Sequence, residues 1–254
     1  MLLAVLGEAL AGVTQEHLLA TKLGYFAEPA RFHSREALLH NSKRTCASAA
    51  LNALTRFNFM KPTFIIGGPP MIRFKVVYRP MCSTTFCADA PALETLRTLK
   101  AQGRCRFIGI SGNTADNMRR VLENVEVDTF LLAFNYDLIR RGAREVLPIA
   151  KEKGCVKLVG AIFQRGLATV QPELLEHPPQ WMSAELVVRY RQIYALQRES
   201  GISLAEMGVR YIAAQPDVDT IIIGAKIPTE IEECVRAAEK AFATADLVEQ
   251  IEKL

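Results

Sequence analysis

The last two thirds of this 254-residue chain alternate amphipathic helical segments with short apolar segments that suit buried strands. Leu93, Leu96 and Leu99 recur at helical spacing, and Val127 to Phe134 is a continuous apolar run. A strand that is apolar on successive residues is buried on both faces, which is typical of a parallel sheet covered by helices. Strands that alternate with helices of ten or more residues indicate βαβ units. The sequence therefore predicts an α/β fold with a parallel sheet.

Six segments have the composition of strands: 18–24, 63–67, 105–110, 127–134, 155–162 and 219–223. Helices are predicted around and between them, at 2–10, 34–55, 91–102, 114–123, 143–153, 183–199, 203–215, 228–240 and 244–254. A parallel (β/α)8 barrel of the TIM type needs eight strands. We therefore expect an incomplete barrel of about six strands, truncated at its N-terminus and forming one domain over residues 1–254. Its sheet should stay open between the first and the last of these strands.

One stretch of the chain departs from the ordinary composition of the rest. From Ala37 to Ala88 there is no Asp or Glu, while seven residues are Lys or Arg. A basic block can bind nucleic acid. Here the basic residues stand singly among Phe, Met, Pro and Cys, without the spacing of a recognition motif, so we expect no nucleic-acid partner. The stretch is atypical, and a damaged or frame-disrupted reading is the alternative it favours.

The remaining composition excludes several classes of protein. No apolar run reaches the roughly 18 residues of a membrane span, and the short apolar opening lacks the basic flank of a signal peptide. The six cysteines show no CxxC and no paired spacing with His, which favours reduced thiols over disulfides or zinc. We therefore expect a cytoplasmic protein that binds no membrane, with its oligomeric state left open.

The residues after the predicted strands are where a barrel of this type carries its chemistry. Glycines and polar residues recur there, as in Ser111-Gly112-Asn113 and Gly224-Ala225-Lys226. The second of these runs into a helix that begins at Pro228. Backbone amides and the helix dipole at such a start favour a phosphate group, and the charge of Lys226 would add to this attraction.

Four stretches of the sequence carry a family resemblance: Gly103-Arg-Cys-Arg-Phe-Ile-Gly-Ile-Ser111, Phe163-Gln-Arg-Gly-Leu167, Gly201 to Cys234, and Ala20-Thr-Lys-Leu-Gly24. Together they resemble the aldo-keto reductase family over about residues 7–26 and 91–241. Within the family the style is closest to the aldose dehydrogenases of the L-fucose or L-galactose type. The resemblance implies a hydride transfer between NAD or NADP and the carbonyl of a small sugar or aldehyde substrate.

In this family a tyrosine gives the proton, a lysine lowers the pKa of that tyrosine, an aspartate holds the lysine, and a histidine orients the carbonyl. Lys22 matches the catalytic lysine. The segment with the aspartate and the tyrosine has no match in this chain, and Gly67-Gly68-Pro69-Pro70 stands where the histidine turn would lie. Alternatively, Lys22 is an ordinary surface lysine.

The match to the cofactor-binding positions is fuller. Ser111 matches the contact to the nicotinamide amide and is followed by Gly112, the loop from Ala161 to Gly166 matches the pyrophosphate loop, and the segment after the last strand matches the adenosine end. The matching positions are Ser111, Gly112, Ala161, Ile162, Phe163, Gln164, Arg165, Gly166, Gly224, Ala225, Lys226, Glu230, Glu233 and Cys234. Phe163 could equally be a core residue, and Lys226 alone would usually be solvated. No metal site is expected.

The sequence thus predicts an NAD(P)-dependent oxidoreductase of this family, with the catalytic competence of the chain left open. Two alternatives remain: a non-catalytic dinucleotide-binding subunit, and a defunct truncated or frame-disrupted product. The choice between NAD and NADP also stays open.

Overall fold

The computed structural model describes residues 9, 13, 20–23, 34–40, 63–67, 91–164, 175–178, 180, 182–240 and 245–254. The chain forms two compact units, each of which is described by itself. The first comprises Met1–Gly112 and Arg120–Phe130, and the second comprises Asn113–Arg119 and Leu131–Leu254. Helix α5 (Ala115–Asn124) and strand β4 (Thr129–Ala133) contribute residues to both units. The prediction of a single domain stays a prediction.

Three parallel strands form the sheet of the first unit: β1 (Ala20–Leu23), β2 (Thr63–Gly67) and β3 (Ile108–Gly112). β1 pairs with β2, and β2 pairs with β3, in both cases parallel. The residues of β3 from Ile108 to Ser111 are all buried, as expected of a strand covered on both faces. The apolar composition that predicted a parallel sheet is confirmed here.

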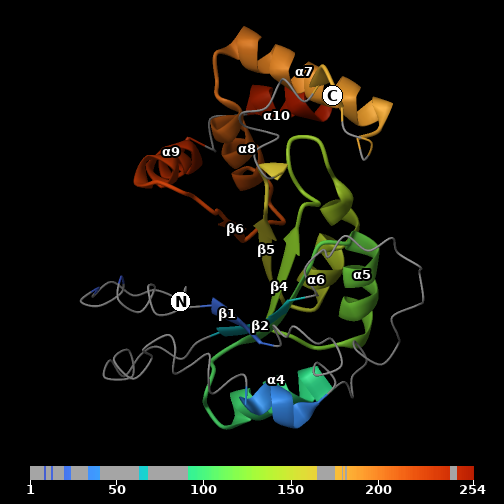
Figure 1. The fold of residues 1–254 in the computed structure, drawn as a ribbon, viewed down its shortest axis with the longest axis vertical. Coiled ribbons are helices and arrows are strands. Elements are labelled where there is room, and N and C mark those ends of the chain that lie inside the picture. The colour runs from blue at the N-terminus through green and yellow to red at the C-terminus, as the bar shows by residue number, and fades with distance from the viewer. Residues whose placement is uncertain are drawn as a thin grey trace. The chain divides into compact units, whose positions relative to one another are not determined.

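A small core holds this unit together beneath its sheet. Helix α4 (Pro91–Ala101) buries Leu96 and Leu99 against Cys105 and against Leu38, which is fully buried in the helical residues 35–40. Figure 1 shows these residues, in blue, beside α4. Ser34 begins the helix as predicted, because its Oγ accepts a hydrogen bond from the Ala37 amide at 3.2 Å.

The second unit contains β5 (Val156–Gly160) and β6 (Thr220–Ile222), which pair in parallel. Its helices are α6 (Leu147–Glu152), α7 (Ala184–Ser200), α8 (Leu204–Ala213), α9 (Pro228–Glu239) and α10 (Ala245–Glu252). Helix α8 is central, since it contacts α7, α9, α10 and β6 (Figure 1). It buries Met207, Val209, Tyr211 and Ile212, so most of the packing of the unit is organised around one helix.

At the amino ends of two strands, an aspartate fixes the register with a neighbouring strand. In the first unit the Asp128 amide donates to the Ile108 carbonyl at 2.9 Å, and its carboxylate accepts from the Ile108 amide at 2.8 Å. In the second unit Asp219 makes the same two bonds with Lys157, at 3.0 and 2.7 Å. A lysine ammonium also bonds each carboxylate, Lys100 at Asp128 and Lys157 at Asp219. We call these two groups the aspartate clamps.

Hydrogen-bonded neighbours in the sheet follow chain order, β1-β2-β3-β4-β5-β6, so the described part of the chain has the six predicted strands. β1 and β6 stand at the two ends of this order, and the predicted opening of the sheet between them stays a prediction. Ile222 of β6 is 44% exposed, as an end strand requires. The predicted neighbours β1–β2, β2–β3 and β5–β6 are parallel.

Three predictions of local structure are wrong in part. The single helix over 143–153 is a 3-10 helix, Gly142–Glu145, followed by α6, because Pro148 has no amide to continue the helical ladder. The strand over 105–110 begins later, at Ile108. The amides of Gly103 and Arg104 bond back to Lys100 and Leu99 and end α4 there, and Cys105 turns into the core.

The third concerns Ser203-Leu-Ala-Glu206, whose spacing predicts a capping box at the start of α8. Ser203 accepts from the Glu206 amide at 3.1 Å, but the Glu206 carboxylate pairs with Arg210 and Lys240 instead of returning to the helix start. The predicted helix over 2–10 and the part of the helix over 34–55 after His40 lie outside the described residues, apart from helical Ala9. In the part of the chain that the structure covers, no helix is long and apolar enough to cross a membrane.

Candidate functional site

The carboxyl ends of β1, β2 and β3 carry three of the residues of interest, Lys22, Gly67 and Ser111, in two rows of register partners. Lys22 of β1 is in register with Ile65, which is in register with Gly109. Two residues further toward the carboxyl edge of the sheet, Gly67 is the register partner of Ser111. Gly67 therefore sits at a strand end, next to the residue matched to the nicotinamide contact, where it offers only its backbone.

The loop after β5 begins with two residues in the left-handed backbone conformation. Ala161 has φ 57° and Gln164 has φ 48°, and the Gln164 amide closes the turn on the Ala161 carbonyl at 3.1 Å. A residue other than glycine in this conformation is strained and persists only where its surroundings hold it. Such strain concentrates at binding sites, which makes this turn the first place to look for a ligand.

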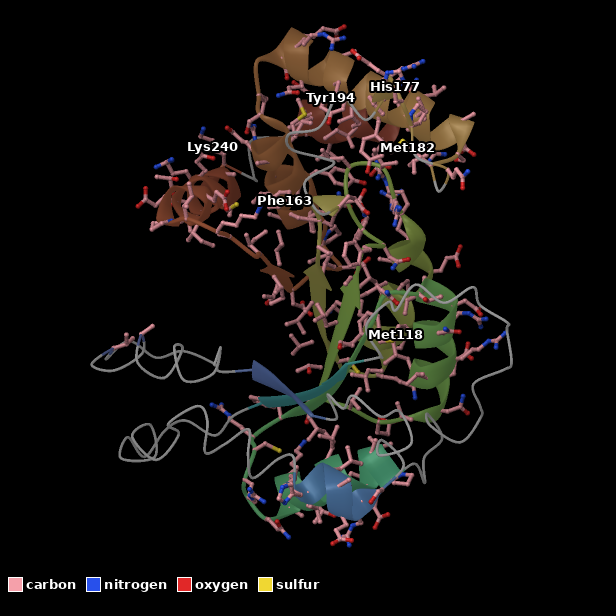
Figure 2. The ribbon with its side chains drawn as sticks, in the orientation of Figure 1. Met118, Phe163, His177, Met182, Tyr194 and Lys240 are labelled. Atoms are coloured by element: carbon pink, nitrogen blue, oxygen red, sulfur yellow. The ribbon has the colours of Figure 1, made fainter. Side chains whose placement is uncertain are left out.

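The side chains of this turn already have partners within the second unit. Ile162 is buried in the core, and Phe163 packs against α8, where a Cβ on Gly208 would lie 3.5 Å from its Cε1 (Figure 2). The Gln164 side chain is 6% exposed and donates to the Asp137 carboxylate. Among the described residues, the amides of Ile162 and Phe163 find no acceptor. A ligand would therefore meet the backbone of this turn; Arg165 and Gly166 lie outside the described residues.

Asp137 is a functional candidate that the sequence analysis missed. It lies four residues after β4 and is 1% exposed, and its carboxylate also accepts from the Ile139 and Arg140 amides at 2.8 and 2.9 Å. Burial raises the pKa of Asp137, against the opposing effect of these hydrogen bonds. The sequence contained one signal: a charged residue flanked by Tyr136 and Leu138, shortly after a buried strand.

The loop from β6 into α9 carries the residues matched to the adenosine end. Gly224, Ala225 and Lys226 are exposed, and Ile227 precedes α9 without a side-chain cap. The Lys226 amide donates to the Glu230 carboxylate at 2.7 Å, so Glu230 folds back over the helix start. Residues 224–230 are nevertheless exposed, so the start of α9 remains accessible, and Lys226 is its nearest cation in sequence.

Cys234 faces a different environment from the two glutamates of the same helix. It lines an apolar groove of about 370 Å³ between α8, β6 and α9, together with Val209, Ile221 and Ile231. Burial raises the pKa of the Cys234 thiol, and the charges of Glu233 and Glu230 add to this effect. Glu230 and Glu233 are exposed. The structure therefore brings Gly224, Ala225, Lys226 and Glu230 together, while Cys234 belongs to the packing of α9.

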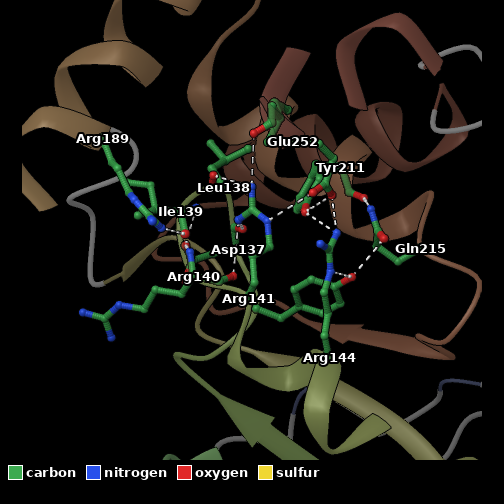
Figure 3. A network of polar contacts seen from close by, with 12 residues as sticks. Asp137, Leu138, Ile139, Arg140, Arg141, Arg144, Arg189, Tyr211, Gln215 and Glu252 are labelled. Atoms are coloured by element: carbon green, nitrogen blue, oxygen red, sulfur yellow. Dashed lines mark hydrogen bonds and ion pairs between the residues drawn. The ribbon is translucent and has the colours of Figure 1, made fainter. Parts of the chain in front are cut away.

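A second polar cluster ties the tail helix α10 to the loop after β4 (Figure 3). Glu252 pairs with Arg144 and accepts from the Tyr211 hydroxyl at 2.6 Å, and the guanidinium of Arg141 lies 4.7 Å from the Tyr211 ring. Burial raises the pKa of Tyr211, and its bond to Glu252 raises it further. Arg141, Arg144 and Glu252 border a cavity of about 210 Å³. Because the cations are already partnered, the cluster is structural. No group of three potential metal ligands occurs among the described residues.

Comparison with known proteins decides the family. The model of the aldo/keto reductase family matches residues 3–254. The chain belongs to the aldo/keto reductase family. It is 28% identical over 150 residues to an L-galactose dehydrogenase of Arabidopsis thaliana, covering 57% of this chain and 46% of that protein. It is 26% identical to a pyridoxal 4-dehydrogenase of Microbacterium luteolum, covering 56% and 42%. The chain thus spans about half the length of these two relatives.

A solved structure confirms the fold of this aldo/keto reductase. An aldo-keto reductase from Bacillus halodurans in its apo form matches with a TM-score of 0.67 and 22% identity, over 99% of this chain and 76% of that one. The fold class predicted from the sequence, a parallel barrel of the TIM type, is therefore confirmed. The roles assigned to individual site residues stay predictions.

Proposed function

We propose that this chain binds NADH or NADPH along the carboxyl ends of β5 and β6, as part of an oxidoreductase that transfers hydride to the carbonyl of a sugar or aldehyde. The turn from Ala161 to Gln164 would take the pyrophosphate on its backbone amides. The loop from Gly224 to Lys226 would take the phosphate side of the adenosine. The observation that carries the proposal is the strained turn after β5, in which the Ile162 and Phe163 amides lack acceptors among the described residues.

Family membership supports the reaction class, and the names of the relatives support the substrate class. One relative is an L-galactose dehydrogenase and another is a methylglyoxal reductase of Escherichia coli. Lys22 is proposed as the catalytic lysine, which would lower the pKa of a proton donor. No residue of this chain matches the proton donor or the orienting histidine of the family. We therefore propose that dinucleotide binding is the activity that the chain shows by itself.

Isothermal titration of the purified chain with NADH and with NADPH tests this proposal. We expect saturable binding of one dinucleotide per chain, at an affinity weakened by the open sheet. NADH absorbance in the presence of a sugar or an aldehyde then measures turnover separately. Absence of heat with both dinucleotides would refute the binding proposal and favour the defunct product among the alternatives.

A further inference from the structure

The loop after β4 is hydrogen-bonded to residues at the carboxyl ends of the two neighbouring strands, β3 and β5. Phe134 begins it in the left-handed conformation, with φ 61°, and its amide donates to the Gly160 carbonyl at 3.1 Å. The Asn135 side-chain amide donates to the Asn113 carbonyl at 2.8 Å, two residues after Ser111. This loop is therefore bonded to the segments that follow both β3 and β5, which are the segments matched to cofactor contacts.

Asp137 is the residue of this loop that reaches the turn after β5. One carboxylate oxygen accepts from the amides of Ile139 and Arg140, and the other accepts from the side-chain amide of Gln164. The backbone of Asp137 is also held, because its amide donates to the Arg140 carbonyl at 3.1 Å and its carbonyl accepts from Arg141 at 2.5 Å. Figure 3 shows Asp137 within this tight turn. The bonds within its own loop thus hold the Asp137 carboxylate in place independently of Gln164.

Two features of Gln164 are stabilised by a fixed hydrogen-bond partner. Its left-handed backbone is one that residues other than glycine adopt at a cost, and its buried side-chain amide would lose hydrogen bonding if Asp137 were absent. The contact to Asp137 meets both requirements at once. It bonds a buried amide and fixes the last described residue of the turn that presents the Ile162 and Phe163 amides.

We propose that Asp137 is a positioning residue for the dinucleotide, acting through Gln164 to hold the turn after β5 in its left-handed, binding-competent form. This inference rests on the proposed function for the role of the turn. The hydrogen bond from Gln164 to Asp137, which we call the clasp, is a property of the free protein. Asp137 does not contact the ligand. It pre-forms the backbone that does, so the ligand need not order the turn on binding.

The test compares Gln164→Leu with Gln215→Leu. The first removes the amide that bonds Asp137 while retaining most of the side-chain volume. The second removes a comparable amide from the end of α8, where Gln215 bonds Tyr136 and the Tyr211 carbonyl and leaves the turn untouched. We expect Gln164→Leu to speed exchange of the residue-164 amide, which closes the turn on the Ala161 carbonyl, at least tenfold in the free protein. We also expect it to weaken NADH binding about tenfold. Gln215→Leu should change neither.

A third variant separates positioning from simple loss of packing. Asp137→Asn keeps an oxygen for the two backbone amides and gains an amide that can donate to Gln164 once the Gln164 amide rotates. We expect it to retain near-normal NADH affinity, whereas Asp137→Ala should behave like Gln164→Leu, and combining the two should add little.

The possible failures can be told apart. A wild-type chain that binds no dinucleotide would refute the proposed function. Amide hydrogen exchange in the free protein would still show whether the Gln164–Asp137 bond holds the turn. Unchanged exchange in Gln164→Leu would overturn the clasp. Faster exchange with unchanged NADH affinity would overturn its positioning role, as would an equal loss of affinity in Gln215→Leu.

Discussion

At the amino ends of β4 and β6 the backbone is regular, with each aspartate clamp closing two hydrogen bonds to a neighbouring strand. At the carboxyl ends of β4 and β5 the chain enters left-handed residues: Phe134, Ala161 and Gln164. These are the three residues other than glycine with positive φ in the described part of the chain. One end of the strands therefore fixes register and stability, whereas the other stores strain, as expected where a barrel binds its ligands.

The largest expected effect is on catalytic turnover, which we expect to be absent. Turnover depends on residues at the carboxyl ends of the strands that the family has and that this chain does not match. By its resemblance to the family, Gly67 stands where the orienting histidine would lie, and no residue matches the proton donor. A positioned acid typically contributes about 10²–10⁴-fold to such a reaction. We predict no reduction of sugars or simple aldehydes above a blank, followed by NADH absorbance near pH 7. Turnover that disappears in Lys22→Met would contradict this and show that the chain uses another acid. Tyr25, three residues after Lys22 in the sequence, would be the first to test.

Removing an aspartate clamp should produce the largest loss of stability. Asp219→Ala leaves the buried Lys157 ammonium without its partner and the Lys157 amide without an acceptor. Since Asp219 is itself partly exposed, we expect a loss of about 2 kcal/mol in the free energy of unfolding, measured by chemical denaturation. The control is Asp217→Ala, whose carboxylate pairs with the exposed Lys151 and should contribute less than about 0.5 kcal/mol. Equal losses in both would show that the clamp adds nothing.

The same clamp predicts a pH dependence. Burial raises the pKa of Asp219, but the hydrogen bonds and charge of Lys157 outweigh it, and the pKa is lowered overall. A lowered pKa in the folded state stabilises the protein above the unfolded value, about 4, and this contribution disappears as the pH falls through the folded value. The difference between the wild type and Asp219→Ala should therefore be full at neutral pH and shrink in acid. A difference independent of pH would contradict the role of the charge.

At the carboxyl end of β6 we expect a smaller effect, confined to binding. Lys226→Ala removes the cation next to the exposed start of α9 and should weaken NADH binding about five- to tenfold, measured by calorimetry, without changing stability. Lys240→Ala is the control, because Lys240 lies at the far end of α9, where it pairs with Glu206. If Lys226→Ala binds as the wild type does, the phosphate role of Lys226 is wrong.

The smallest effect tests the strain directly. Ala161→Gly places a residue that tolerates positive φ at a position with φ 57° and should stabilise the protein by about 0.5–1 kcal/mol. Ala150→Gly, within the ordinary helix α6, should destabilise it. Thermal unfolding of both variants measures the difference. Destabilisation by Ala161→Gly would show that the turn is not strained.

The sequence predicted the six strands and most of the helices because apolar period and turn residues act locally. It failed at Pro148 and at Cys105, where a missing amide and a helix-ending turn decide the boundary. At the site, the sequence identified the loops but not the partners of their side chains. Nothing local pairs Gln164 with Asp137, because that bond joins residues 27 positions apart. Phe163 packs against Gly208 of α8 and is partly buried, so its predicted contact to the cofactor stays a prediction.

The most direct test of the account is hydrogen exchange across the chain with and without saturating NADH. Binding at the carboxyl ends of β5 and β6 predicts protection of the amides at residues 161–164 and 224–230, with no change at Lys157 and Asp219 at the opposite ends of the same strands. Protection confined to the amino ends, or no protection at either loop while heat of binding is measured, would contradict the central claim.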